Sequence, residues 1–190
     1  MYRRHLKLIC PLGLLLGLAA LAAGLLRAKV FLSVDEALRL AFPNCAVERR
    51  TVFLTPEQKS RVGQLAKGEV KSALVNPYHA TCGGKDGGTA YFDSHVVRTL
   101  PETLMVVIDP QGKVKRIEVL SFAEPEDYLP PTRWYGQLVG QSLSDDLALG
   151  RHIRNVTGAS LTARATTEAV RRMLALHQVL SSQAPAGAKP

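Results

Sequence analysis

Residues 157–162 read TGASLT and lead directly into a helix-forming stretch that runs from Ala163 to Leu180. The segment consists of Thr157, Gly158, Ala159, Ser160, Leu161 and Thr162, and all of these except Leu161 are small or carry a hydroxyl group. In the first turn of a helix the backbone N–H groups have no intrahelical acceptor, and the positive end of the helix dipole favours an anion. The segment therefore predicts a phosphate site at the start of the last helix.

Individual residues of this segment suit contact with a phosphate. Gly158 permits a backbone turn that a Cβ would resist, and the hydroxyls of Thr157, Ser160 and Thr162 are potential donors. Arg154, just upstream, can add a charge-assisted hydrogen bond, so we include it in the predicted site. The residues alone leave open a simpler interpretation, in which Thr157 or Thr162 only caps the helix.

An apolar run without a charge extends from Leu8 to Leu26. As a helix of 19 residues it would be about 28 Å long at ~1.5 Å per residue, close to the ~30 Å hydrocarbon core of a bilayer. Positive charge is in excess on its N-terminal side, which predicts a cytoplasmic N-terminus and an extracytoplasmic (periplasmic) body. A cleaved signal peptide, with a small-residue site at residues 20–22, is the alternative.

The net charge of +8 at first suggests nucleic acid as a partner. However, five of the 24 basic residues flank the apolar run, where no acid lies, which leaves 19 basic against 16 acidic residues for the rest of the chain. A scattered excess of that size does not form a nucleic-acid-binding stripe. Membrane topology explains the charge better, and we expect no nucleic-acid partner.

Two of the three cysteines, Cys45 and Cys82, lie in the predicted body, while Cys10 lies inside the apolar run. In an oxidising extracytoplasmic space Cys45 and Cys82 are candidates for a disulfide, although their spacing alone does not establish one. His79 precedes Cys82 by three residues, but further metal ligands are not recognisable nearby. The sequence therefore predicts no metal site.

Several local patterns predict secondary structure. Capping boxes at Ser33 and Thr55 predict helices ending near Ala41 and Ala66, and the β-favouring residues between them predict a strand over 46–54. Residues 76–88 are rich in glycine, which predicts a flexible loop or hairpin. Residues 103–108 and 113–122, joined by a DPQG turn, predict a β-hairpin.

In the last helix the expected buried face is Ala169, Val170, Met173, Leu174, Leu176 and Leu180, with Arg171, Arg172 and Gln178 facing water. Together these patterns predict an α+β fold: a single compact extracytoplasmic domain with a twisted antiparallel sheet and flanking helices, preceded by one N-terminal transmembrane helix. The expected organisation is an anchor or signal over 1–29, a domain over 30–180 and a disordered tail over 181–190.

The segment from Val156 to Val170, VTGASLTARATTEAV, closely resembles the FMN-binding domain family, whose mark is a Ser/Thr-Gly-Ala-Ser/Thr tetrad before a helix. That family includes the flavin-carrying peripheral subunits of the sodium-pumping NADH:quinone oxidoreductase and of the Rnf electron-transport complex. A looser likeness extends from about Val34 to Leu180. The resemblance implies FMN as the cofactor and an FMN-binding domain over residues 30–180.

In such proteins a separate flavin transferase commonly links the FMN phosphate to the hydroxyl of the last tetrad residue, which is Ser160 here. Two positions differ from the usual pattern, since Arg154 stands where relatives often have an acidic residue and the acceptor is Ser rather than Thr. Covalent attachment and tight noncovalent binding, the latter strengthened by Arg154, therefore both remain open.

The resemblance also implies a function in electron transfer. The expected protein is a membrane-anchored extracytoplasmic flavoprotein that relays electrons between membrane redox proteins or within a quinone-linked complex, and is not a stand-alone enzyme. The alternative is a non-catalytic assembly or interaction module that has lost flavinylation. Candidates for contact with the flavin ring are Tyr91, Trp134, Tyr135, Arg98 and Lys85.

Overall fold

The computed structural model describes residues 28–182. The predicted membrane-spanning run, its alternative cleavage site and residues 183–190 of the predicted tail lie outside the described residues. Within 28–182, no helix combines the length and the apolar composition needed to cross a bilayer. The last helix continues through Ser181, one residue into the segment predicted as a tail.

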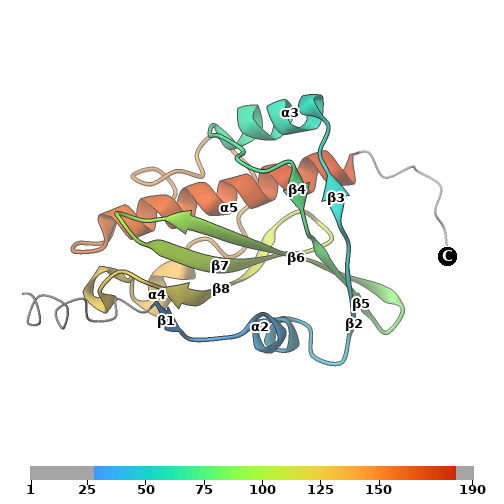
Figure 1. Cartoon of the computed structure of the whole chain (residues 1–190), viewed down its shortest axis with the longest axis horizontal. Helices are drawn as coiled ribbons and strands as arrows, with labels where there is room; N and C mark the ends of the chain where they lie inside the picture. Colours follow the sequence, from blue (N-terminus) through green and yellow to red (C-terminus); the bar gives the residue numbers. More distant parts are fainter. Residues whose placement is uncertain (1–27, 183–190) are drawn as a thin grey trace, which may run out of the picture.

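The centre of the fold is a six-stranded sheet with the order β1-β8-β7-β6-β5-β2, in which all neighbouring strands are antiparallel (Figure 1). Its strands are β1 (Lys29–Val30), β2 (Ala46–Arg49), β5 (Tyr78–Cys82), β6 (Lys85–Val96), β7 (Pro101–Ile108) and β8 (Val114–Phe122). The predicted hairpin is confirmed as β7–β8, and the glycine-rich segment forms the β5–β6 hairpin. The predicted antiparallel α+β fold is therefore confirmed.

The prediction of one continuous strand over 46–54 is wrong. The chain leaves the main sheet after β2, and β3 (Val52–Phe53) pairs instead with β4 (Leu74–Val75) in a separate two-stranded ladder. At the break, Arg50 N–H donates to Pro77 O over 2.9 Å and Thr51 Oγ1 donates to Asn76 Oδ1 over 3.1 Å. These bonds to residues before β5 redirect the chain out of the main sheet. Local β propensity carries no information about such long-range bonds.

Helices cover both faces of the sheet (Figure 1). They are α2 (Val34–Ala41), α3 (Pro56–Ala66), the short α4 (Thr132–Tyr135) and α5 (Ser160–Ser181), with a 3-10 turn, η1, at Glu126–Tyr128. The capping boxes predicted at Ser33 and Thr55 are both present. The α3 and α5 helices pack on one face over the larger core, and α2 packs on the other face over a smaller core.

The long helix α5 begins at Ser160, three residues earlier than predicted, and the five expected residues from Ala169 to Leu176 are buried while Leu180 is half-buried. Arg171, however, does not face water as predicted, because it is 5% exposed. Its guanidinium donates to backbone oxygens of Ala66, Leu65, Ser144 and Leu147. Carbonyl acceptors at the end of α3 thus offset the burial of this charge.

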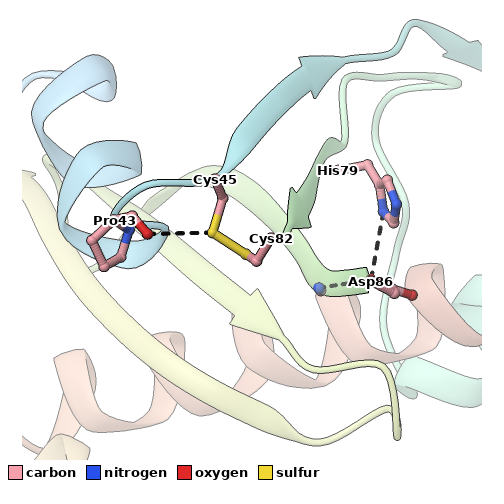
Figure 2. Close-up of a disulfide and its surroundings, with 6 residues drawn as sticks. Pro43, Cys45, His79, Cys82 and Asp86 are labelled. Atoms are coloured by element: carbon pink, nitrogen blue, oxygen red, sulfur yellow. Dashed lines mark hydrogen bonds and ion pairs between the residues drawn. A yellow bond between two sulfur atoms is a disulfide. The ribbon is translucent and has the colours of Figure 1, made fainter. Parts of the chain in front are cut away.

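A disulfide joins Cys45, just before β2, to Cys82, at the end of β5, with the two Cα atoms 4.3 Å apart (Figure 2). It continues the β2–β5 ladder, in which Ala46 lies opposite Thr81. Cys45 Sγ lies 3.4 Å from Pro43 O, which is a contact and not a hydrogen bond, because an oxidised sulfur carries no proton. The pairing that the sequence left open is therefore present.

Candidate functional site

Hydrogen bonds to its backbone atoms hold the loop that leads into α5 in place. Trp134 Nε1 donates to Arg154 O over 2.7 Å, and Arg154 N–H donates to Gln137 Oε1 over 3.0 Å. Gly158 follows with φ at +86°, a left-handed conformation that disfavours a Cβ. Ala159 N–H then donates to Val156 O over 3.3 Å, and the helix begins at the next residue.

The N-terminus of α5 carries no side-chain cap. Its N-cap residue is Ala159, which has no side-chain acceptor, and among residues 28–182 no side chain makes a capping hydrogen bond to this helix end. The interpretation of Thr157 or Thr162 as a simple cap therefore does not apply. The N–H groups of the first turn point outward without such a partner, and this arrangement favours an anion.

The uncapped helix end opens into a pocket of about 190 Å³. One wall comes from the segment at the start of α5 and consists of Gly158, Ala159, Ser160, Leu161 and Thr162. The opposite wall consists of Val97, Arg98, Glu124 and Tyr128. We call this cavity the tetrad pocket. It is not lined by Thr157 or Arg154, both of which are exposed; the Arg154 Nε instead donates to Gln137 Oε1 over 3.4 Å.

The hydroxyls in the pocket already donate to backbone oxygens. Ser160 Oγ donates to Val156 O over 3.1 Å, and Thr162 Oγ1 donates to Tyr128 O over 2.5 Å. The Thr162 bond connects η1 to α5, and Thr162 is 1% exposed. The backbone N–H groups of the first turn are therefore the principal donors to an anion here, and the Ser160 hydroxyl oxygen is held at the pocket wall.

Charged groups on the opposite wall are also ordered. Glu124 accepts from Thr99 N–H over 2.6 Å and from Leu100 N–H over 2.8 Å, and these bonds hold the pKa of its carboxyl below the usual range. Arg98 lies over the Tyr128 ring, with its guanidinium carbon 5.7 Å from the ring centroid. The carboxylate thus shapes the β6–β7 turn, while Arg98 supplies positive charge beside the helix end.

A larger groove of about 630 Å³ lies beside the tetrad pocket, between β6, α5 and the segment 67–76. We call it the β6–α5 groove. The alternation of Tyr91, Asp93 and His95 puts these three side chains on the face of β6 toward α5. The sequence analysis missed the roles of Asp93 and His95; their spacing of two, which puts both side chains on one face when the segment is a strand, was the available signal.

A partly buried polar cluster borders the β6–α5 groove. Arg172 donates to Asp93 Oδ2 over 2.7 Å, and His95 bonds Asp93 through Nδ1 at 2.9 Å and Glu102 through Nε2 at 3.1 Å. Burial opposes the charged form of His95, but the hydrogen bonds and charges of Asp93 and Glu102 raise its pKa to about 9. Burial of Asp93 acts to raise the pKa of its carboxyl, but the hydrogen bonds and charges of His95 and Arg172 hold that pKa below its usual range.

The structure separates the residues predicted to contact a ring. Arg98 lines the tetrad pocket and Tyr91 lines the β6–α5 groove, where its hydroxyl lies 3.1 Å from His177 Nδ1. Trp134 and Tyr135 are buried in the core and line neither cavity. Lys85 lies at the β5–β6 turn and also lines neither. Within 28–182 no group of three or more potential metal ligands is found.

Residues 100–175 match the family model described as the FMN-binding domain. The matched region extends from the β6–β7 turn through most of α5 and contains the whole TGASLT segment. The match supports an FMN-binding domain in this part of the chain, with FMN as its cofactor. Neither the curated proteins nor the solved structures provided a match to the chain.

Proposed function

We propose that this protein is a membrane-anchored extracytoplasmic flavoprotein that holds FMN at the start of α5 and relays electrons between redox partners. The observation that carries the proposal is the uncapped N-terminus of α5, which opens into the tetrad pocket inside the segment that matches the FMN-binding family. The N–H groups of Ser160, Leu161 and Thr162 would hold the phosphate, with Arg98 adding positive charge.

Ser160 is the proposed point of covalent attachment. Its Oγ would form an ester bond to the phosphorus of FMN, and the hydroxyl proton would leave together with the group displaced from phosphorus. The net change relative to free FMN is the loss of one water, and a flavin transferase would supply the activated donor. The position of Ser160 in the lining of the tetrad pocket supports this role.

Bound FMN supplies the redox chemistry, and the protein holds the cofactor and shapes its surroundings. A cofactor tethered by its phosphate is not lost by diffusion, which suits a carrier at a membrane face. The partners we propose are membrane redox proteins or a quinone-linked complex. Support for the location comes from the apolar run over Leu8–Leu26 with its basic N-terminal flank, and from the Cys45–Cys82 disulfide, which is typical of oxidising compartments.

One observation favours a second candidate, an assembly module that has lost flavinylation. Arg154 occupies a position that is often acidic in the family, and its side chain lies against Gln137 instead of lining the tetrad pocket. A transferase that recognises the acidic residue would then fail to modify this chain. This candidate predicts that Ser160→Ala leaves partner binding intact and that the wild-type protein carries no flavin.

Intact-protein mass distinguishes these candidates. The full chain is expressed together with a flavin transferase and purified in detergent, and its mass is compared with that of Ser160→Ala. We expect an added mass equal to FMN less one water in the wild type, its loss in Ser160→Ala and its retention in Ser160→Thr. Ser60→Ala, which removes an exposed hydroxyl on α3, is the matched control and should keep the added mass.

Noncovalent binding is measured in the same preparations. If the mass is unchanged but FMN titration shows saturable binding, the flavoprotein proposal stands without the ester. A colourless wild type that also fails to bind added FMN would overturn the proposal and favour the assembly module.

A further inference from the structure

The tetrad pocket is too small to enclose a whole flavin nucleotide. Its volume of about 190 Å³ is below the roughly 300–1,000 Å³ of typical small-molecule sites, whereas the β6–α5 groove, at about 630 Å³, lies within that range. Residues that are close to one another in the chain line the two cavities. On β6 and the following turn, Val96 lines the groove and Val97 the pocket; on α5, Ala165 lines the groove and Leu161 the pocket.

Strand β6 and helix α5 run in opposite directions along this path. Starting from the helix end, the contacts occur in order between Thr166 and Glu102 at 3.2 Å, between Arg172 and Asp93 at 2.7 Å and between His177 and Tyr91 at 3.1 Å. Residue Glu102 pairs with His95 in the sheet. The groove itself follows β6 from Val96 to Tyr91, and a ligand held by its phosphate at Ser160 would meet it first at Val96 and Ala165.

The floor of the groove is a free strand edge. Strand β5 pairs with β6 only as far as Tyr78 opposite Ala90, while β6 continues to Val96. In the described part of the chain no other strand pairs with this outer edge, and residues 91–96 all line the groove. Backbone N–H and C=O groups along such an edge seek hydrogen-bond partners. The pyrimidine half of a flavin ring carries both donors and acceptors and complements them.

The groove walls combine apolar and charged groups. Apolar wall residues include Val62, Val70, Tyr91, Met173 and Leu176. The charged and titratable groups that line it, apart from Tyr91, are Arg49, Lys67, Glu69, Lys71, Tyr78, Asp93, His95, Glu168 and Arg172. Arg172 and His95 are fixed in orientation by Asp93 and Glu102, since each is held by ion pairs on the inner side. Ordered cations beside an apolar slot suit an aromatic ring that gains negative charge on reduction.

We propose that the β6–α5 groove receives the isoalloxazine ring of the FMN, with the free edge of β6 bonding its pyrimidine half and Arg172 beside it as the group that raises its reduction potential. This inference rests on the proposed function, because the phosphate must first be held in the tetrad pocket. Two electrons enter the ring on reduction, together with protons from solvent, and a nearby cation stabilises the more electron-rich form. In the tests below, dithionite supplies the electrons.

The position of the ring is tested by filling the groove next to the pocket. In Ala165→Trp the new indole occupies the groove entrance, while the tetrad and its N–H groups are unchanged. We expect the flavin to remain bound in this variant. Its ring should become accessible to iodide, a collisional quencher of flavin fluorescence, whereas the ring in the wild type should be protected from iodide. Gln178→Trp, at an exposed site on the same helix that lines neither cavity, should behave as the wild type.

The role of Arg172 is tested by potentiometry on the flavin-loaded full chain. Arg172→Gln should lower the equilibrium constant for two-electron reduction by at least tenfold, which corresponds to about 30 mV, and Arg172→Lys should recover most of the difference. Arg164→Gln, which removes an exposed cation that lines neither cavity, is the matched control and should shift the potential by much less.

The outcomes separate this inference from the proposed function. Suppose that the wild type binds FMN but that the flavin ring is as accessible to iodide as in Ala165→Trp, or that Arg172→Gln and Arg164→Gln have the same flavin reduction potential. In either case the ring lies elsewhere, so the groove proposal fails while flavin binding stands. If the wild type binds no FMN, both proposals fail. Protection in the wild type, its loss in Ala165→Trp and a selective effect of Arg172 support the placement.

Discussion

At the scale of single residues, the structure assigns a specific electrostatic role to His95. Its imidazole bonds the carboxylates of Asp93 and Glu102, with Arg172 on the far side of Asp93, and these contacts raise its pKa to about 9. Because the pKa in the folded state exceeds the ordinary value of 6.5, protonated His95 stabilises the folded state fully below about pH 6.5. That stabilisation is lost as the pH rises through about 9.

This linkage predicts the behaviour of His95→Gln. The free energy of unfolding should fall below that of the wild type near neutral pH, and the difference should shrink once the pH exceeds about 9. Urea unfolding of both proteins over this pH range measures the effect, with His152→Gln at an exposed position as the control. A difference that stays constant, or grows, between about pH 7 and pH 10 would contradict the assignment.

At the scale of elements, the last helix shows where sequence reasoning was sufficient and where it was not. The apolar spacing identified most of the buried face of α5, and the TGASLT segment marked its uncapped start. The same spacing wrongly predicted that Arg171 faces water. Periodicity carries no information about the carbonyl acceptors that α3 and the segment 144–147 contribute. The charge cluster around Asp93 was not predicted for a related reason. Its partner Arg172 lies on α5, 79 residues further along the chain.

The contacts of Arg171 predict a large effect on the packing of α3 against α5. In Arg171→Met the backbone oxygens of Ala66, Leu65, Ser144 and Leu147 lose their charged donor. We expect the free energy of unfolding to fall by on the order of 3 kcal/mol, since hydrogen bonds to charged groups contribute about 1.5–3 kcal/mol each and the apolar side chain recovers part of that. Urea denaturation measures it.

The control for that prediction is Arg164→Met, because Arg164 is exposed on the same helix. It should change stability by about 0.5 kcal/mol or less. Equal losses in the two variants would mean that the bonds of Arg171 contribute little to the association of α3 with α5.

At the scale of the whole molecule, the disulfide joins β2 and β5 at the end of their ladder opposite to Arg49 and Tyr78, the residues of these strands that line the β6–α5 groove. Cys45 and Cys82 are separated by 37 residues, a segment that includes β2, β3, α3 and β4. In the chain-entropy model, opening a loop of this length costs about 4 kcal/mol of stability. The double variant Cys45→Ala with Cys82→Ala should therefore unfold at a lower urea concentration.

That variant should nevertheless bind FMN with the wild-type affinity, because neither cysteine lines the tetrad pocket or the β6–α5 groove. Fluorescence titration with FMN in the absence of urea is the measurement. Affinity that fell in parallel with stability would show that the sheet edge and the cofactor site are coupled.

The overall arrangement of the molecule was predictable to the extent that local signals determine it. Capping boxes, the DPQG turn and the helix pattern predicted α2, α3, α5, the β7–β8 hairpin and the antiparallel class of the sheet. The strand order, the departure of β3 from the main sheet and the free edge of β6 depend on long-range pairing, which no local pattern encodes. The tetrad could be recognised from its residues, but its opposite wall, from Val97 to Tyr128, emerged only in the folded chain.

The account depends on a phosphate bound by the first turn of α5, and a crystal structure of the protein with FMN tests this most directly. We predict the phosphorus in the tetrad pocket, with its oxygens within hydrogen-bond distance of the N–H groups of Ser160, Leu161 and Thr162. A structure in which FMN is bound with its phosphate at another place, or in which the pocket is filled by protein side chains in the presence of excess FMN, would contradict the account.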